Sequence, residues 1–240
     1  MTVRFLTCGD TAVTVEFGDR IDRIVSEAVL RLNARVRDAN LPGVVETVPT
    51  FRSLTVHYDP LATSPAILIS GIANLVDDAR DETNPSKLWR VPACYATSHA
   101  PDLADVAHRT GLSPEEIVHL HAGIRFHVYM LGFAPGYPYM GDLPLRMMLP
   151  RRTDPRTRVP AGSIAIAAGM TAIYPVESPG GWHLIGATPI RLFDPRGSRP
   201  ALFKPGDTVR FEPISAREFD AIRADVARDA YDVPCETVAA

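Results

Sequence analysis

The fold is decided by two adjoining stretches, LGFAPGYPYMGDLP at residues 131–144 and PRRTDPRTRVPAGSIAIAAGMTAIYPVESPGGWHLIGATP at residues 150–189. Both consist of short apolar runs separated by turns that are rich in glycine and proline. Residues 131–213 hold 13 prolines and 10 glycines, whereas residues 1–90 hold only 5 and 4. Many short strands between such frequent turns are typical of a sandwich or a barrel. The pattern therefore predicts a mainly-β second part, built as a sandwich or as a closed barrel.

Residues 1–90 follow a different pattern, in which strands and helices alternate. Apolar residues first alternate with polar ones, as in a half-buried strand, and then recur at helical spacing up to Val36. A second helix is expected after Ser64, and Leu88–Val91 is expected to be the last strand. The order βαββαβ, with an added N-terminal hairpin, favours an α+β ferredoxin-like fold. We therefore divide the chain into a domain at 1–90 and a barrel domain at 91–240.

The composition excludes several classes of protein. The 240 residues carry a net charge of -3, so the chain lacks the positive charge typical of proteins that bind nucleic acid or attach to membranes through basic residues. No apolar run approaches the ~20 residues of a membrane span, and charged residues interrupt the N-terminal segment where a secretory signal would be apolar. Cys8, Cys94 and Cys235 are far apart and never in CxxC spacing, which argues against a disulfide scaffold and fits a reducing cytoplasm.

Several catalytic signatures are absent from the sequence. It has no GxxxxGKS/T phosphate loop, and neither Lys87 nor Lys204 lies in a glycine-rich loop of that kind. The HExxH motif, the GxSxG elbow and the kinase motifs are missing as well. These absences argue against an independent ATPase, a zinc hydrolase or a serine esterase.

The stretches at 131–144 and 150–189 resemble the B subunit of prokaryotic 5-oxoprolinase. That family also includes the Kip-type inhibitors of sporulation kinases and proteins called allophanate hydrolase subunit 1. CGDTAVTVEFG at 8–18, VPTFRSLTVHYDP at 48–60 and KPGDTVRFEPI at 204–214 match the family pattern too, so the resemblance covers nearly the whole chain. It implies a ferredoxin-like N-terminal domain followed by a cyclophilin-like β-barrel. The same two modules resemble the carboxyltransferase half (subdomains C and D) of urea carboxylase.

The chain departs from the family pattern at three places. Met170 and Ala172 flank a threonine where the family usually has Gln-Thr-Gly, Ala187 stands in place of an arginine, and Asp142 replaces a common glycine. An amide and a guanidinium are thereby lost from a wall of the expected site. These changes bear on the identity of the substrate more than on the fold.

Arg151 and Arg158 are the first candidate site residues, in a loop that also holds Arg152, Asp154 and Arg156. The planar fork of arginine suits carboxylates and phosphates, so this loop could hold the carboxylate of 5-oxoproline or a phosphate of ATP. A solvated loop, or the rim of a subunit interface, fits the same residues equally well. The resemblance ranks Arg151 and Arg158 above the others, with Arg158 in the catalytic set, and we expect Arg152 at the rim.

A turn at 160–163 can aim backbone N–H groups at an anion, and Ser163 can donate a hydroxyl hydrogen bond. We place Gly162 among the binding residues, although simple turn chemistry is the stronger explanation for Gly162 alone. We place Ser163 in the catalytic set as a hydrogen-bond donor. It is not assigned as a nucleophile, because no base accompanies it.

Tyr174, Ser178 and Trp182 form a polar and aromatic run that is expected to bind the substrate or the nucleotide. Trp182 follows two glycines and could stack against a flat ring of a ligand, although such a tryptophan more often packs in the hydrophobic core. His183 stands where the family varies and receives no role.

His121 is expected near the barrel mouth as a proton carrier in the catalytic set, because it matches a family position. His119 and His121 are two residues apart on an expected helix and face different sides, and His127 lies on a strand. This spacing fits no metal site, so no metal ligand is expected.

These features lead to one main hypothesis and two alternatives. The resemblance implies a hydrolase subunit that acts with a C-subunit partner, and also with an A subunit, to open the lactam of 5-oxoproline. It further implies that ATP, with Mg²⁺, is shared with the partner and that the chain alone is inactive. The first alternative is a carboxyltransferase or allophanate hydrolase-like subunit of urea metabolism. The second is a regulatory binder that inhibits a sensor histidine kinase.

Overall fold

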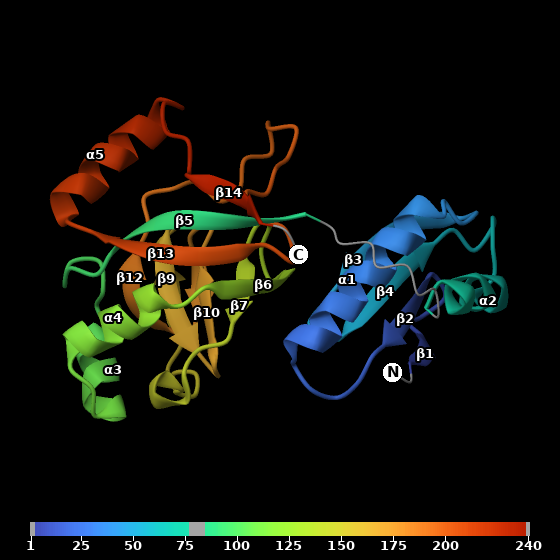
Figure 1. Ribbon diagram of the computed structural model, residues 1–240, viewed down its shortest axis with the longest axis horizontal. Helices are drawn as coiled ribbons and strands as arrows, with labels where there is room; N and C mark the ends of the chain where they lie inside the picture. Colours follow the sequence, from blue (N-terminus) through green and yellow to red (C-terminus); the bar gives the residue numbers. More distant parts are fainter. Residues whose placement is uncertain (1–2, 77–84, 239–240) are drawn as a thin grey trace. The chain divides into compact units, whose positions relative to one another are not determined.

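The computed structural model describes residues 3–76 and 85–238, and the chain forms two compact units (Figure 1). The first unit ends at Ser86, and the second runs from Lys87 to Val238. Within the described residues, no helix is both long enough and apolar enough to cross a membrane.

The first unit is an antiparallel sheet with two helices. The sheet has the order β1-β2-β4-β3, and each neighbouring pair is antiparallel. Val13 of β2 and Leu54 of β4 share one buried core with Leu32 of α1 and Ile72 of α2. The elements are β1 (Arg4–Thr7), β2 (Ala12–Glu16), α1 (Arg23–Asp38), β3 (Val44–Pro49), β4 (Ser53–Tyr58) and α2 (Pro65–Val76).

The strand expected at Leu88–Val91 does not close this sheet. It lies in β5 (Ser86–Cys94), which belongs to the second unit and pairs in parallel with β13 (Thr208–Ile214). The expectation was wrong because an apolar run predicts a strand without identifying its partner. The N-terminal strand β1 flanks β2 instead.

The second unit is a barrel, so the prediction of a mainly-β barrel is confirmed. Its strands follow the order β12-β9-β10-β7-β6-β13-β5, and the ring closes where Ala187 of β12 pairs with Cys94 of β5. Strand β14 (Cys235–Val238) extends the sheet beyond β5. The remaining barrel strands are β6 (Phe126–Leu131), β7 (Pro138–Gly141), β9 (Ser163–Ala167), β10 (Met170–Ile173) and β12 (His183–Ala187).

Helices and one small sheet surround the barrel. Helix α3 (Leu103–Thr110) packs against β12, and α4 (Pro114–Gly123) packs against β13. Helix α4 begins at the capping box that the sequence predicts, where Ser113 and Glu116 exchange hydrogen bonds of 3.1 and 2.7 Å. The other elements are η1 (Leu145–Met147), β8 (Arg156–Val159), β11 (Ser178–Gly180) and α5 (Ala216–Ala227), and β8 pairs with β11.

Strand β9 is buried on both faces. Ile164 and Ile166 lie in the large core of the barrel, whereas Ala165 and Ala167 lie in a separate cluster with large aromatic side chains. Side chains alternate across a strand, so one face of β9 presents isoleucines and the other presents small alanines. The alanine face leaves room for the aromatic residues that form the candidate site.

Candidate functional site

An aromatic cluster with one arginine lies on the alanine face of the barrel wall. The rings of Tyr137 and Tyr174 meet edge to face at 5.1 Å, and those of Tyr139 and Trp182 meet at 6.0 Å. The guanidinium carbon of Arg151 lies 6.0 Å from the centre of the Trp182 ring. Burial raises the pKa of all three tyrosines, and the nearby Arg151 partly offsets the rise. The phenols are therefore protonated at neutral pH.

The backbone of the turn at 160–163 is tied to this cluster. Gly162 donates its N–H to the carbonyl oxygen of Tyr174 at 2.7 Å, and Tyr174 donates its N–H to that of Ser163 at 3.0 Å. Gly162 has a φ of +83°, and an added Cβ atom would lie 2.4 Å from the carbonyl oxygen of Thr188. Glycine is thus required here for backbone reasons. The N–H groups of Gly162 and Ser163 both bond to carbonyl oxygens within the chain.

Trp182 and Arg158 do not lie in the surroundings expected of binding residues. Trp182 is only 5% exposed, so it packs in the cluster and does not offer an open face to a flat ring. Arg158 lies outside the cluster, because its guanidinium forms two hydrogen bonds of 3.0 Å with the carboxylate of Glu177. The Arg158 side chain is 78% exposed. Its charge is already paired at the surface.

His121 lies in the core and not at the mouth of the barrel. Its Nδ1 atom is 2.8 Å from the hydroxyl of Tyr95, and its Nε2 atom is 3.0 Å from that of Thr171. Thr171 donates to the carbonyl oxygen of Ala165, so the Thr171 oxygen accepts from His121 Nε2–H, and Tyr95 donates to Nδ1. The ring also stacks on Phe211 at 4.5 Å.

Burial sets the charge of this histidine as well. It lowers the pKa of His121 from 6.5 to about 3, so the ring is neutral at physiological pH. Both ring nitrogens are engaged within the protein. This geometry argues against the expected role as an exposed proton carrier, because neither nitrogen is open to a substrate.

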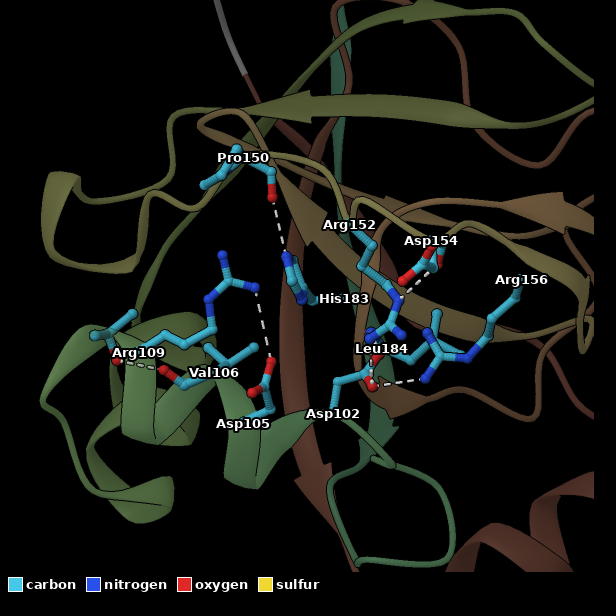
Figure 2. A network of polar contacts seen from close by, with 11 residues as sticks. Asp102, Asp105, Val106, Arg109, Pro150, Arg152, Asp154, Arg156, His183 and Leu184 are labelled. Atoms are coloured by element: carbon cyan, nitrogen blue, oxygen red, sulfur yellow. Dashed lines mark hydrogen bonds and ion pairs between the residues drawn. The ribbon is translucent and has the colours of Figure 1, made fainter.

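A buried carboxylate binds two of the four arginines of the 150–158 loop (Figure 2). Asp102 is 5% exposed, and its Oδ1 atom accepts hydrogen bonds from Arg156 at 2.6 Å and from Arg152 at 3.3 Å. Its Oδ2 atom accepts the backbone N–H of Leu184 at 2.7 Å. Arg152 is therefore half-buried and bound to a buried carboxylate, which corrects its expected place at a rim.

His183 adjoins the same network in Figure 2. It is fully buried, and its Nε2 atom lies 2.9 Å from the carbonyl oxygen of Pro150. A second hydrogen bond holds the arginine loop in place, because the backbone N–H of Arg152 donates to the carbonyl oxygen of Gly181 at 2.7 Å. The hydrogen bond from His183 therefore fixes the position of Pro150, the residue directly before the arginine loop.

The structure brings only some of the predicted residues together. Arg151, Tyr174 and Trp182 share the aromatic cluster, and Gly162 and Ser163 are joined to it through backbone hydrogen bonds. Asp102, Arg156 and His183 were missed as site residues. Arg156 belonged to a visible run of arginines, but nothing in the sequence links that run to Asp102, which lies 54 residues earlier.

Other features concern metals and the departures from the family pattern. Across residues 3–76 and 85–238, no group of three or more His, Cys, Asp or Glu side chains could hold a metal ion.

Two of the departures from the family pattern lie near the aromatic cluster. Ala172 packs in this cluster, and Ala187 pairs with Ser163 at the end of β12. Two of the three departures are therefore next to the candidate site.

The barrel, the helices beside it and the arginine loop define a class of protein. Residues 3–203 match the family model described as "Carboxyltransferase domain, subdomain C and D". The chain is also 38% identical to the B subunit of 5-oxoprolinase from Bacillus subtilis (strain 168), over 94% of this chain and 99% of that protein. The chain belongs to this carboxyltransferase-domain family and, within it, to the group of 5-oxoprolinase B subunits.

Solved structures share the fold of this chain. The chain resembles the crystal structure of TTHA0988 with a TM-score of 0.76 and 34% identity, covering 85% of this chain and 40% of that one. It also resembles the Kluyveromyces lactis urea amidolyase with a TM-score of 0.80 and 22% identity, covering 98% of this chain and 16% of that one. The second likeness is one of fold alone. The chain spans less than half the length of either structure.

Proposed function

We propose that this chain is the B subunit of an ATP-dependent 5-oxoprolinase, which hydrolyses the lactam C–N bond of 5-oxoproline. The observation that carries the proposal is the 38% identity to a 5-oxoprolinase B subunit over nearly the full length of both proteins. The likeness to urea amidolyase is weaker in sequence and confined to a small part of that enzyme. A role in urea metabolism therefore has less support.

The two units fit the domain arrangement that this function implies. We assign the first unit to a ferredoxin-like domain in which β1 occupies the edge that a closing strand would take. We assign the second to a cyclophilin-like barrel that carries the chemistry. The proposed cellular location is the cytoplasm, where the three free cysteines, Cys8, Cys94 and Cys235, would stay reduced.

Arg151 is the proposed anion contact of the aromatic cluster. Its side chain is exposed, and within the described residues it has no ion-pair partner. Arg158 would first have to leave the carboxylate of Glu177, so we move the anion-binding role from Arg158 to Arg151. The phenol of Tyr137 donates its hydrogen bond to the hydroxyl of Tyr174, so the protonated Tyr174 hydroxyl, which lies near Arg151, is the donor left for a ligand. In this proposal Ser163 contributes a hydroxyl donor, and His121 supports the wall from inside.

Gly162, Ser163 and Trp182 do not form a cradle for the phosphates of ATP. The N–H groups of Gly162 and Ser163 are bonded within the chain, and the face of Trp182 is buried. Activation by ATP is still required, because an amide in an unstrained five-membered ring is a poor electrophile and its oxygen a poor leaving group. We therefore propose that ATP, with Mg²⁺, is held mainly by a partner of the C-subunit type, and that an A subunit completes hydrolysis.

The test is to purify the complex formed with the partner subunits and to measure ATP hydrolysis with and without 5-oxoproline. Arg151→Ala should reduce the 5-oxoproline-dependent rate about 10- to 150-fold, the effect of losing a charge-assisted hydrogen bond of roughly 1.5–3 kcal/mol. Arg146→Ala is the matched control, because Arg146 is a comparably exposed arginine near Glu116. Equal rates for both variants would contradict the assignment of Arg151.

A further inference from the structure

Two hydrogen bonds hold the start of the arginine loop against a segment that runs in the opposite direction. The backbone N–H of Arg152 donates to the carbonyl oxygen of Gly181 at 2.7 Å. His183 Nε2 lies 2.9 Å from the carbonyl oxygen of Pro150, and because a carbonyl oxygen can only accept, this nitrogen donates. One bond therefore lies directly before position 151 and the other directly after it. We refer to residues 150–152 and 181–183 as the paired segments.

Arg151 is the middle residue of its segment and faces the middle residue of the other. Its guanidinium carbon lies 6.0 Å from the centre of the Trp182 ring. Trp182 and Leu184 both pack in the aromatic cluster, and side chains alternate along a strand, so His183 between them points to the opposite face. His183 is also fully buried. It therefore contacts the backbone before Arg151 from outside the cluster, away from any ligand that Arg151 binds.

Asp102 holds the same loop from the start of α3. It occupies the N-cap position of that helix, where an aspartate commonly accepts N–H groups of its own helix, but its side chain makes no such bond. Instead, Oδ1 accepts from Arg152 at 3.3 Å and from Arg156 at 2.6 Å, and Oδ2 accepts the N–H of Leu184 at 2.7 Å (Figure 2). The carboxylate thus joins the arginine loop to the strand that begins with His183.

These contacts fix the residues on both sides of Arg151 but leave its own charge available. Its side chain is exposed, and within residues 3–76 and 85–238 no carboxylate forms an ion pair with it. A long side chain loses less conformational freedom on binding an anion when its backbone is already held in place. The arrangement is therefore that of a preorganised anion contact.

We propose that His183 and Asp102 are positioning residues for Arg151. His183 holds the carbonyl group before Arg151, Asp102 holds the side chain after it, and the Arg151 guanidinium is thereby kept over Trp182, where it meets the carboxylate of the substrate. In this proposal neither positioning residue touches the substrate. The inference rests on the function proposed above, because that function gives Arg151 its anion.

Steady-state kinetics of the complex with the partner subunits test this positioning. A contact to the substrate carboxylate is the same before and during the reaction, so its weakening raises the KM for 5-oxoproline and leaves kcat nearly unchanged. His183→Leu removes the N–H donor and should raise this KM roughly tenfold, because a misplaced binding group costs an order of magnitude or more. His183→Gln keeps an N–H donor at a similar reach and should restore most of the original KM.

Two further variants complete the kinetic comparison. Asp102→Asn weakens the bonds to both arginines, so it should raise the KM for 5-oxoproline as His183→Leu does. His127→Leu, at another buried histidine of the barrel unit, is the matched control and should leave the KM unchanged.

A double substitution separates positioning from a general structural role. If His183 acts through Arg151, His183→Leu should change the KM little in a chain that already carries Arg151→Ala. A preparation that is only less folded loses kcat and keeps its KM, because the folded fraction binds substrate as before. A fall in kcat alone, or KM effects of the two substitutions that multiply in the double variant, overturns the proposal.

Amide hydrogen exchange keeps this inference apart from the proposed function. His183→Leu should speed the exchange of the Arg152 amide roughly tenfold, because the paired segments separate more often, and leave that of Val128, which bonds to Asp207, unchanged. Equal exchange at Arg152 in the variant and the original chain overturns the positioning, whatever the complex catalyses. An original complex without 5-oxoproline-dependent ATP hydrolysis overturns the proposed function, and faster exchange at Arg152 in the variant still supports the hold on the loop.

Discussion

Acidification should destabilise the barrel unit through His121. The pKa of this buried ring is about 3 in the folded chain and near 6.5 when the ring is exposed by unfolding. Below pH 6.5 the unfolded chain therefore binds a proton that the folded chain does not. Stability contributed by the neutral ring is present above pH 6.5 and is lost as the pH falls toward 3.

The magnitude follows from the two pKa values. Between pH 7 and pH 4.5 this histidine alone should lower the free energy of unfolding by about 2.5 kcal/mol. His121→Gln removes the titration, so its free energy of unfolding should depend less on pH over the same range. At pH 7 the variant should be less stable by roughly 1–3 kcal/mol, because the hydrogen bonds to Tyr95 and Thr171 are disturbed.

Urea unfolding monitored by tryptophan fluorescence is a suitable assay, because Trp89 and Trp182 both lie in the barrel unit. His119→Gln is the matched control. His119 is exposed on the same helix, so this variant should keep the pH dependence of the original chain. Parallel pH profiles for the original chain and His121→Gln would refute the reasoning, since they would mean that His121 does not titrate differently in the folded state.

Three other substitutions have defined outcomes in the same urea assay. Gly162→Ala should cost roughly 2–4 kcal/mol, because a Cβ atom would lie 2.4 Å from a carbonyl oxygen at a φ of +83°; Gly123→Ala, where the space is open, should not destabilise the chain, and an equal loss would contradict the steric account. Asp102→Asn should cost roughly 2–4 kcal/mol, because two partly buried arginines lose their counter-charge; an unchanged midpoint would show that the network adds no stability. Arg158→Ala should change stability by less than about 1 kcal/mol, because its ion pair with Glu177 is exposed; a larger loss would mean that the pair is buried by some further contact.

Local patterns predicted the kinds of elements well. The capping box before α4 and the short strands of the 150–189 stretch follow from hydrogen bonding and periodicity within a few residues. The partner of β5 could not be predicted in this way. Its apolar run fits either sheet, and only the packing of the whole chain places it in the barrel beside β13.

The candidate site was predicted less completely, for a similar reason. Arg151 and Trp182 both belong to the stretch at 150–189, and they do meet. The role of Arg152 depends on Asp102, a carboxylate about fifty residues away whose position is set by the start of α3. His121 was misplaced because its position on a helix does not reveal that Tyr95 and Thr171 enclose both ring nitrogens. Residue type indicates chemistry, but burial decides whether that chemistry is available.

The most direct test of the central claim is the formation of glutamate from 5-oxoproline by a mixture of this chain with its partner subunits, ATP and Mg²⁺. We expect glutamate to form only when this chain is present, with ATP consumed in step, and we expect the isolated chain to produce none. Full turnover without this chain, turnover without ATP, or complete turnover by the chain alone would contradict its assignment as one subunit of an ATP-dependent 5-oxoprolinase.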